Sequence, residues 1–197
     1  MWQSLPELVN GVEILKPFLF RYGFTLDDFE NYKGGSGGQV TEASFTKGNK
    51  KFNIGYRYSL GKLNYHCGDA VVTHAFYLDG LGYAEQKKFP DFQSDDKLKV
   101  FRNILHDLEY LVDDFFAGDC SRLKMLAVQE AEQTAEYNRK AQIEYNYSFE
   151  KIFIDDARRE FKNKDYKKCL ANYDKVVHMH LLTDLDRKFI EFCKKHQ

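Results

Sequence analysis

The chain has 197 residues, which is enough for one large domain or for a modest domain with an appendage. Hydrophobic residues make up 43% and charged residues 30%, a globular composition that excludes wholesale disorder. The formal net charge of -1 provides no long-range attraction to phosphate backbones or anionic lipids. Nothing in this composition therefore favours a nucleic-acid-binding protein. No stretch approaches the roughly 18 apolar residues that span a bilayer, so we expect no membrane protein.

The compartment is predicted from the amino terminus and the cysteines. Residues 1–24 mix charged side chains into apolar ones and show no small-residue cleavage site, so they do not resemble a signal peptide. The four cysteines lie far apart and show no C-x-x-C spacing. Free thiols in a reducing compartment are the default for such a chain, which predicts a cytoplasmic protein.

The first predicted elements are a helix and an antiparallel sheet. Residues 5–22 place apolar side chains three or four apart, the spacing of one buried helix face. From Phe24 onward the period changes to two, most clearly where large apolar residues alternate with polar ones at Phe52, Ile54, Tyr56, Tyr58 and Leu60. Turns at 48–50 and 61–62 flank this strand, so residues 24–68 predict a meander of three to four strands.

The rest of the chain is predicted to be helical. A short helix is expected over 73–82, and a strongly amphipathic one from Asp95 to Gly118 should cover the sheet together with the first helix. Residues 120–148 predict a long, partly exposed connecting helix, followed by helices over 149–162, 165–180 and 183–196 with N-caps at Asp165 and Thr183. The predicted fold class is therefore α+β, with an α+β domain over 1–118 and an all-helical region over 119–197.

Two resemblances bear on function. The pattern from Ala157-x-x-x-Phe161 through Asp165-Tyr166 to Tyr173 resembles one tetratricopeptide-type helical hairpin, which implies a role in protein interaction. Separately, the helical region is the predicted site of homo-oligomer formation. The glycine-rich segment 34–38, the aromatic strand 56–61 and the stretch 106–109 together resemble small bacterial proteins of conflict systems. That resemblance implies an immunity or defence-accessory protein and assigns no site residues.

The glycine-rich segment and the histidines provide no defined catalytic or metal motif. A phosphate-binding loop leads into a helix, whereas residues 39–45 read as a strand, so the glycines predict a connection between strands; a nest of backbone amides that grips a ligand is the alternative. His66 and Cys67 point to opposite faces of a strand and cannot readily share one metal ion. For Cys67 we expect a buried, inert thiol rather than a nucleophile paired with His74. For the His106-Asp107 pair we expect capping or surface hydrogen bonds. We expect no cofactor.

The residues most suggestive of function share one predicted sheet face. If Phe52, Ile54 and Tyr56 face the helices, the opposite face carries the polar residues Glu42, Ser44, Asn53, Arg57, Ser59, Asn64 and His66. Three interpretations remain open: a solvated face with cross-strand ion pairs, a recognition surface, or an acid–base site.

The sequence thus predicts a non-enzymatic, cytoplasmic protein that binds a protein partner. The residues predicted to bind are those of the sheet face and the glycine loop, namely Gly35, Ser36, Gly37, Glu42, Asn53, Arg57 and His66. The alternative is an enzyme or sensor in which Arg57, Glu42 and His66 hold a small anionic ligand.

Overall fold

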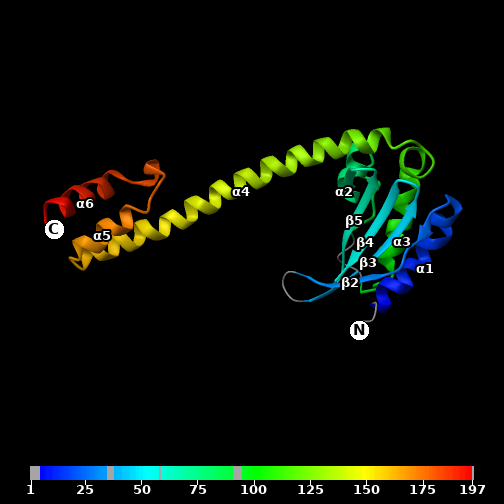
Figure 1. Ribbon diagram of the computed structural model, residues 1–197, viewed down its shortest axis with the longest axis horizontal. Helices are drawn as coiled ribbons and strands as arrows, with labels where there is room; N and C mark the ends of the chain where they lie inside the picture. The colour runs from blue at the N-terminus through cyan, green and yellow to red at the C-terminus, as the bar shows by residue number, and fades with distance from the viewer. Residues whose placement is uncertain (1–4, 35–37, 58, 91–94, 197) are drawn as a thin grey trace. The chain divides into compact units, whose positions relative to one another are not determined.

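The structure is a computed structural model that describes residues 5–34, 38–57, 59–90 and 95–196 (Figure 1). It divides the chain into two compact units, Met1–Glu132 and Gln133–Gln197. The first unit contains an antiparallel sheet with helices and the second is helical, so the predicted α+β class is confirmed.

The first unit is built on a six-stranded antiparallel sheet in the order β1-β3-β4-β5-β6, with β2 also paired to β3. The strands are β1 Thr25–Leu26, β2 Glu30–Lys33, β3 Gln39–Lys47, β4 Lys50–Tyr56, β5 Leu60–Cys67 and β6 Ala70–Thr73. The predicted strands correspond to β3, β4 and β5. The additional strands are two to four residues long, too short for an alternating pattern to be recognised.

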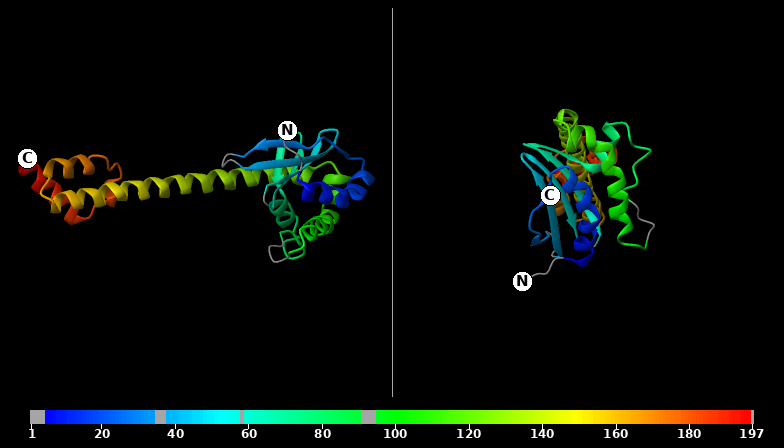
Figure 2. Two further views of the ribbon diagram at one scale, coloured as in Figure 1. Left: turned by 90° about the horizontal axis from the view of Figure 1, so that it is seen from below. Right: turned by 90° about the vertical axis from the view of Figure 1, so that its right-hand side faces the viewer.

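One face of this sheet forms the main hydrophobic core. Phe45, Phe52, Tyr65 and Val72 pair across four adjacent strands and are fully buried. The helices α1 (Pro6–Arg21) and α3 (Lys99–Leu108) cover this face, as Figure 2 shows. Ile54, Tyr56 and Leu60 are buried as predicted, whereas Tyr58 lies outside the described residues.

The predicted helix from Asp95 to Gly118 is broken into shorter pieces. After α3 the chain forms a 3-10 turn, η1 (Glu109–Leu111), and a π-helical turn, η2 (Val112–Phe116). In η2 the Asp114 carboxylate accepts hydrogen bonds from the Tyr77 hydroxyl of α2 (His74–Gly80) at 2.5 Å and from the backbone N–H groups of Arg122 and Leu123. Asp114 therefore ties the end of this segment to the start of the next helix.

That next helix, α4 (Ser121–Lys162), is one continuous helix where the sequence suggested a break near residue 148. Its first turns pack within the first unit, since Leu123 is fully buried and Glu130 accepts a 2.8 Å hydrogen bond from the Thr73 N–H group. The structure consequently divides the chain after Glu132, whereas the sequence suggested a boundary after residue 118. Among the described helices, none is both long and apolar enough to span a membrane.

The second unit combines the rest of α4 with α5 (Tyr166–Tyr173), a 3-10 turn η3 (Met179–Leu181) and α6 (Asp184–Lys195). Asp165 and Thr183 cap α5 and α6 as predicted. The second core contains Ile154, Ala157, Cys169, Leu170, Tyr173, Val176, Leu182 and Cys193. The helix predicted over 165–180 corresponds to α5, which ends at Tyr173 instead of continuing to residue 180.

An ion pair whose carboxylate is buried ties α4 to α6 in this unit. Both Nε and Nη2 of Arg158 donate 2.7 Å hydrogen bonds to the Asp186 carboxylate, which is fully buried. The Tyr173 hydroxyl and the Thr183 hydroxyl and backbone N–H also donate to this carboxylate, at 2.8, 2.6 and 2.9 Å. Such a bidentate arginine–carboxylate contact fixes geometry as well as charge.

Candidate functional site

The predicted sheet face exists, because the strand register places its residues side by side. Ser44 of β3 is opposite Asn53 of β4, and Asn53 is opposite Asn64 of β5. Glu42 and His66 lie two residues from these pairs and therefore share their face. Of the predicted binding residues, Gly35, Ser36 and Gly37 lie outside the described residues.

This face is less exposed than the sequence suggested. Glu42 is only 7% exposed and Asn53 only 4%. The Glu42 carboxylate accepts hydrogen bonds from the Tyr32 hydroxyl at 2.5 Å and from the Asn53 amide at 3.0 Å. Because its proton is held by that carboxylate, the pKa of Tyr32 rises to about 12. The interpretation as a solvated face is therefore wrong at Glu42 and Asn53, which are buried. Tyr32, which binds Glu42, belongs to the short strand β2, which the sequence did not reveal.

A small hollow lies at one end of this face. Its volume is about 140 Å³, and it is lined by Tyr32, Val40, Glu42, Gly55, Tyr56, Arg57, Ser59 and Gly61. A Cβ atom on Gly34 would lie 3.5 Å from the guanidinium carbon of Arg57, so the start of the glycine-rich segment runs beside this side chain. The structure thus brings Glu42 and Arg57 together next to Gly34. Neither His66 nor Asn53 lines the hollow, although the Asn53 amide donates a hydrogen bond to Glu42, which does.

A second polar cluster lies inside the core of the first unit. The Tyr65 hydroxyl lies 2.7 Å from Nδ1 of His74, and Nε2 of His74 lies 3.2 Å from the Asp107 carboxylate. Asp107 also accepts from the backbone N–H groups of Lys88 and Phe89. The expectation of a surface position for Asp107 is wrong, because this side chain is fully buried.

The Tyr65–His74–Asp107 chain resembles a catalytic relay in connectivity but lacks access for a substrate. Tyr65 and Asp107 are fully buried and His74 is 2% exposed. Burial alone would raise the pKa of Asp107, but its hydrogen bonds from His74, His106 and the backbone lower it. The carboxylate thus stays charged and holds residues 88–89 against α3. Cys67 is buried as predicted, and the described part of the chain holds no cluster of three or more side chains suited to a metal ion.

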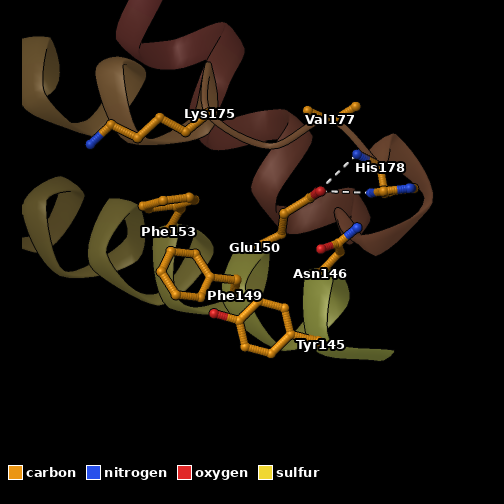
Figure 3. A pocket seen from close by; sticks show the side chains of 8 residues that line it. All are labelled: Tyr145, Asn146, Phe149, Glu150, Phe153, Lys175, Val177 and His178. Atoms are coloured by element: carbon orange, nitrogen blue, oxygen red, sulfur yellow. Dashed lines mark hydrogen bonds and ion pairs between the residues drawn. The ribbon is translucent and has the colours of Figure 1, made fainter. Parts of the chain in front are cut away.

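An open groove that the sequence did not predict lies in the second unit. Its volume is about 420 Å³ (Figure 3). The α4 residues Tyr145, Phe149 and Phe153 form one wall, four residues apart along the helix, and the segment between α5 and η3 forms the other. Tyr145 is 61% exposed and Phe149 is 50% exposed, so large apolar surfaces border this groove.

The groove has few polar side chains, and some of them already form hydrogen bonds or ring contacts within the chain. Glu150 accepts hydrogen bonds from the N–H group of His178 at 2.8 Å and from Nδ1 of its ring at 2.6 Å. Although burial raises the pKa of Glu150, these hydrogen bonds outweigh it and lower the pKa. Lys175 lies with Nζ 5.1 Å from the centre of the Phe153 ring, an interaction that keeps a cation at the rim. The groove therefore presents aromatic surface and one positive charge.

Comparisons with known proteins provide no family for this chain. No protein-family model, no curated protein and no solved structure matches it. The functional argument therefore depends on the geometry and chemistry of the surfaces described above.

Proposed function

We propose that this chain is a non-enzymatic protein that binds another protein through the aromatic surface of its second unit, formed by Tyr145, Phe149, Ile152, Phe153 and Val177. The observation that carries the proposal is the exposure of these side chains. Ile152 is 54% exposed and Val177 is 77% exposed, in addition to the two aromatic residues already described. Neighbouring large apolar side chains that remain half exposed are typical of surfaces that a partner covers.

The chemistry of this surface favours a protein segment over a small metabolite. The groove is open and mainly apolar, and its one carboxylate is occupied by His178. An enzyme needs titrating groups within reach of a substrate, but Tyr65, Tyr77 and Tyr173, whose pKa values are raised by burial above all, are enclosed in the cores. A helix or extended segment that inserts apolar side chains fits the groove better.

The predicted biological setting depends on the resemblance to bacterial conflict-system proteins. An immunity or defence-accessory role on these grounds stays a prediction. A cytoplasmic location is supported by the four cysteines, which are all free and buried.

A matched pair of variants tests the proposed surface. Tyr145 and Tyr137 both lie on α4 and are 61% and 72% exposed, but only Tyr145 borders the groove. Affinity purification from the host cell should recover one defined protein with the wild-type chain and with Tyr137→Glu, but not with Tyr145→Glu. Equal recovery with both variants would contradict the proposal.

The second candidate function is the binding of a small anion beside Arg57. Two observations favour it. Arg57 lines the hollow of about 140 Å³, and Gly34 lies close to the Arg57 guanidinium. Calorimetric titration of the chain with inorganic phosphate should show binding that the change Arg57→Gln abolishes. The control change Arg139→Gln, which removes the same charge on α4, should leave this binding intact. Absence of heat with the wild-type chain at millimolar phosphate would remove this candidate.

A further inference from the structure

We propose that the α4 residues Tyr145, Phe149 and Ile152 of this surface are covered by α4 of a second copy of this chain, packed antiparallel around a two-fold axis near Lys140. This inference rests on the proposed function and specifies its partner. It starts from the middle of α4, where every residue from Ala131 to Asn146 is exposed. A helical segment without packing is marginal in water, because most helical stability in proteins comes from a buried face.

The exposed part of α4 carries a regular stripe. The stripe consists of residues spaced alternately three and four apart, namely Val128, Ala131, Ala135, Asn138, Gln142, Tyr145, Phe149 and Ile152. All of them are exposed. This spacing is that of the inner positions of a two-stranded coiled coil, in which each side chain packs between residues of the facing helix. Tyr137, although more exposed than Tyr145, lies off the stripe.

The stripe is complementary to itself in the antiparallel direction. Residues equally distant in sequence from Lys140 would meet, which pairs Ala131 with Phe149 and Ala135 with Tyr145. Each large aromatic side chain would therefore lie against an alanine, which provides the space that the ring needs. The same symmetry pairs two amides, Asn138 and Gln142, and two branched aliphatic residues, Val128 and Ile152.

A parallel arrangement lacks this complementarity. In a parallel pair in register, Ala131 and Ala135 would face their own copies and leave a thin core. Tyr145 and Phe149 would also face their own copies and force the helices apart at the other end. Since cavities and overpacked layers both destabilise a core, the antiparallel order is favoured.

The flanking residues permit close approach of the two helices. On one side of the stripe Thr134, Ala141 and Ser148 are all small. On the other side Arg139 would approach its own copy near the axis, but its guanidinium already donates two 2.9 Å hydrogen bonds to Glu136, which offsets the like charge. At the centre, the Gln142 amide donates to Asn146 on the same helix. On association it would exchange that hydrogen bond for one with Asn138 of the other copy.

The test is sedimentation equilibrium of the purified full-length chain over a range of concentrations. The wild-type chain should form a reversible dimer. Tyr145→Glu and Ala135→Lys should each raise the dimer dissociation constant about 100-fold or more, because each places a charge in a closed layer. Tyr137→Glu should leave it unchanged. Circular dichroism checks that each variant keeps its helix content, and Ala135→Lys, at an exposed helical position, is the variant least able to disturb the fold.

The double variant Ala135→Lys with Tyr145→Glu reports the direction of packing. In the antiparallel pair each introduced lysine faces an introduced glutamate of the other copy, so the dissociation constant should return to within about 10-fold of the wild-type value. In a parallel pair like charges face each other and association stays lost. A wild-type chain that remains monomeric, equal effects of Tyr145→Glu and Tyr137→Glu, or no rescue would each overturn the inference.

The failure of this inference can be told apart from failure of the proposed function. The sedimentation experiment contains only this chain, whereas purification from the host cell identifies any partner. A monomeric chain that nevertheless recovers a different protein through Tyr145 would overturn the self-association and leave the proposed function standing.

Discussion

The change Asp186→Asn should weaken the second unit selectively. Asp186 is fully buried and binds Arg158 through two 2.7 Å hydrogen bonds. It also accepts from Tyr173 and closes a capping box with Thr183 at the start of α6. Asparagine preserves the shape of the side chain but removes its charge and replaces one accepting oxygen by an NH2 donor. The variant therefore tests the ion pair together with the hydrogen bonds to that oxygen.

The expected loss in the free energy of unfolding is about 3 kcal/mol. Removing one partner of a buried ion pair costs about 3 to 5 kcal/mol, because the other charge is left buried. The Arg158 side chain is 38% exposed and can regain hydration in the variant, which places the cost at the lower end of that range. The remaining amide oxygen of the asparagine still accepts a hydrogen bond from Arg158 or Tyr173.

The buried cysteines provide an assay within one molecule. Cys169 and Cys193 lie in the core of the second unit, and Cys67 and Cys120 lie in the core of the first. A thiol reagent labels each pair only when its unit opens. A loss of about 3 kcal/mol should accelerate labelling of Cys169 and Cys193 by about 100-fold and leave the other pair unchanged. Acceleration below about 10-fold, or equal acceleration of both pairs, would refute the reasoning.

The stability that Asp186 contributes to the second unit should be lost in acid. Burial alone would raise the pKa of Asp186, but hydrogen bonds from Arg158, Thr183 and Tyr173 bring it well below the ordinary value. Its stabilising contribution is therefore complete above the unfolded carboxyl pKa of about 4 and is lost as the pH falls through the lowered pKa. The difference in melting temperature between wild type and Asp186→Asn should be constant from pH 7 to 5 and shrink below about pH 4. A difference that already shrinks between pH 7 and 5 would contradict this assignment.

Two further changes probe the first unit. Gly11→Ala should lower the free energy of unfolding, measured by urea denaturation, by about 1 to 2 kcal/mol. The new Cβ atom would clash with the fully buried ring of Phe101, and this clash outweighs the gain of about 1 kcal/mol in helix propensity. A rise in stability would contradict this close packing of α1 on α3. Asp107→Asn should weaken the hold on the N–H groups of Lys88 and Phe89, and limited proteolysis should then cut faster after Lys87 and Lys88 than in the wild type. An unchanged cleavage rate would show that Asp107 does not hold this segment.

Local patterns in the sequence predicted the central sheet but not its surroundings. The alternation around Phe52 and Ile54 is carried by neighbouring residues, so it placed β4 and its buried face as the structure has them. Strands such as β1 have two residues and no pattern. The burial of Glu42 depends on Tyr32, ten positions away along the chain, and a hydrogen bond across that distance leaves no periodic signal.

The binding surfaces follow the same distinction. The four-residue spacing of Tyr145, Phe149 and Phe153 along α4, which forms one wall of the groove, can be read from the sequence. The other wall depends on the contact between Glu150 and His178, which are 28 positions apart and meet only through the turn after α5. Likewise the sheet-face register brought Glu42 beside Asn53, but only the fold shows that His66 stays outside the hollow next to Arg57.

The claim central to this account is that another helix covers the exposed middle of α4. Hydrogen exchange of the backbone amides between Thr134 and Asn146, measured at several protein concentrations, tests it most directly. The account predicts that these amides exchange slowly at high concentration and rapidly on dilution, while the amides of α1 stay constant as an internal reference. Exchange in this segment that is equally rapid at every concentration would contradict it.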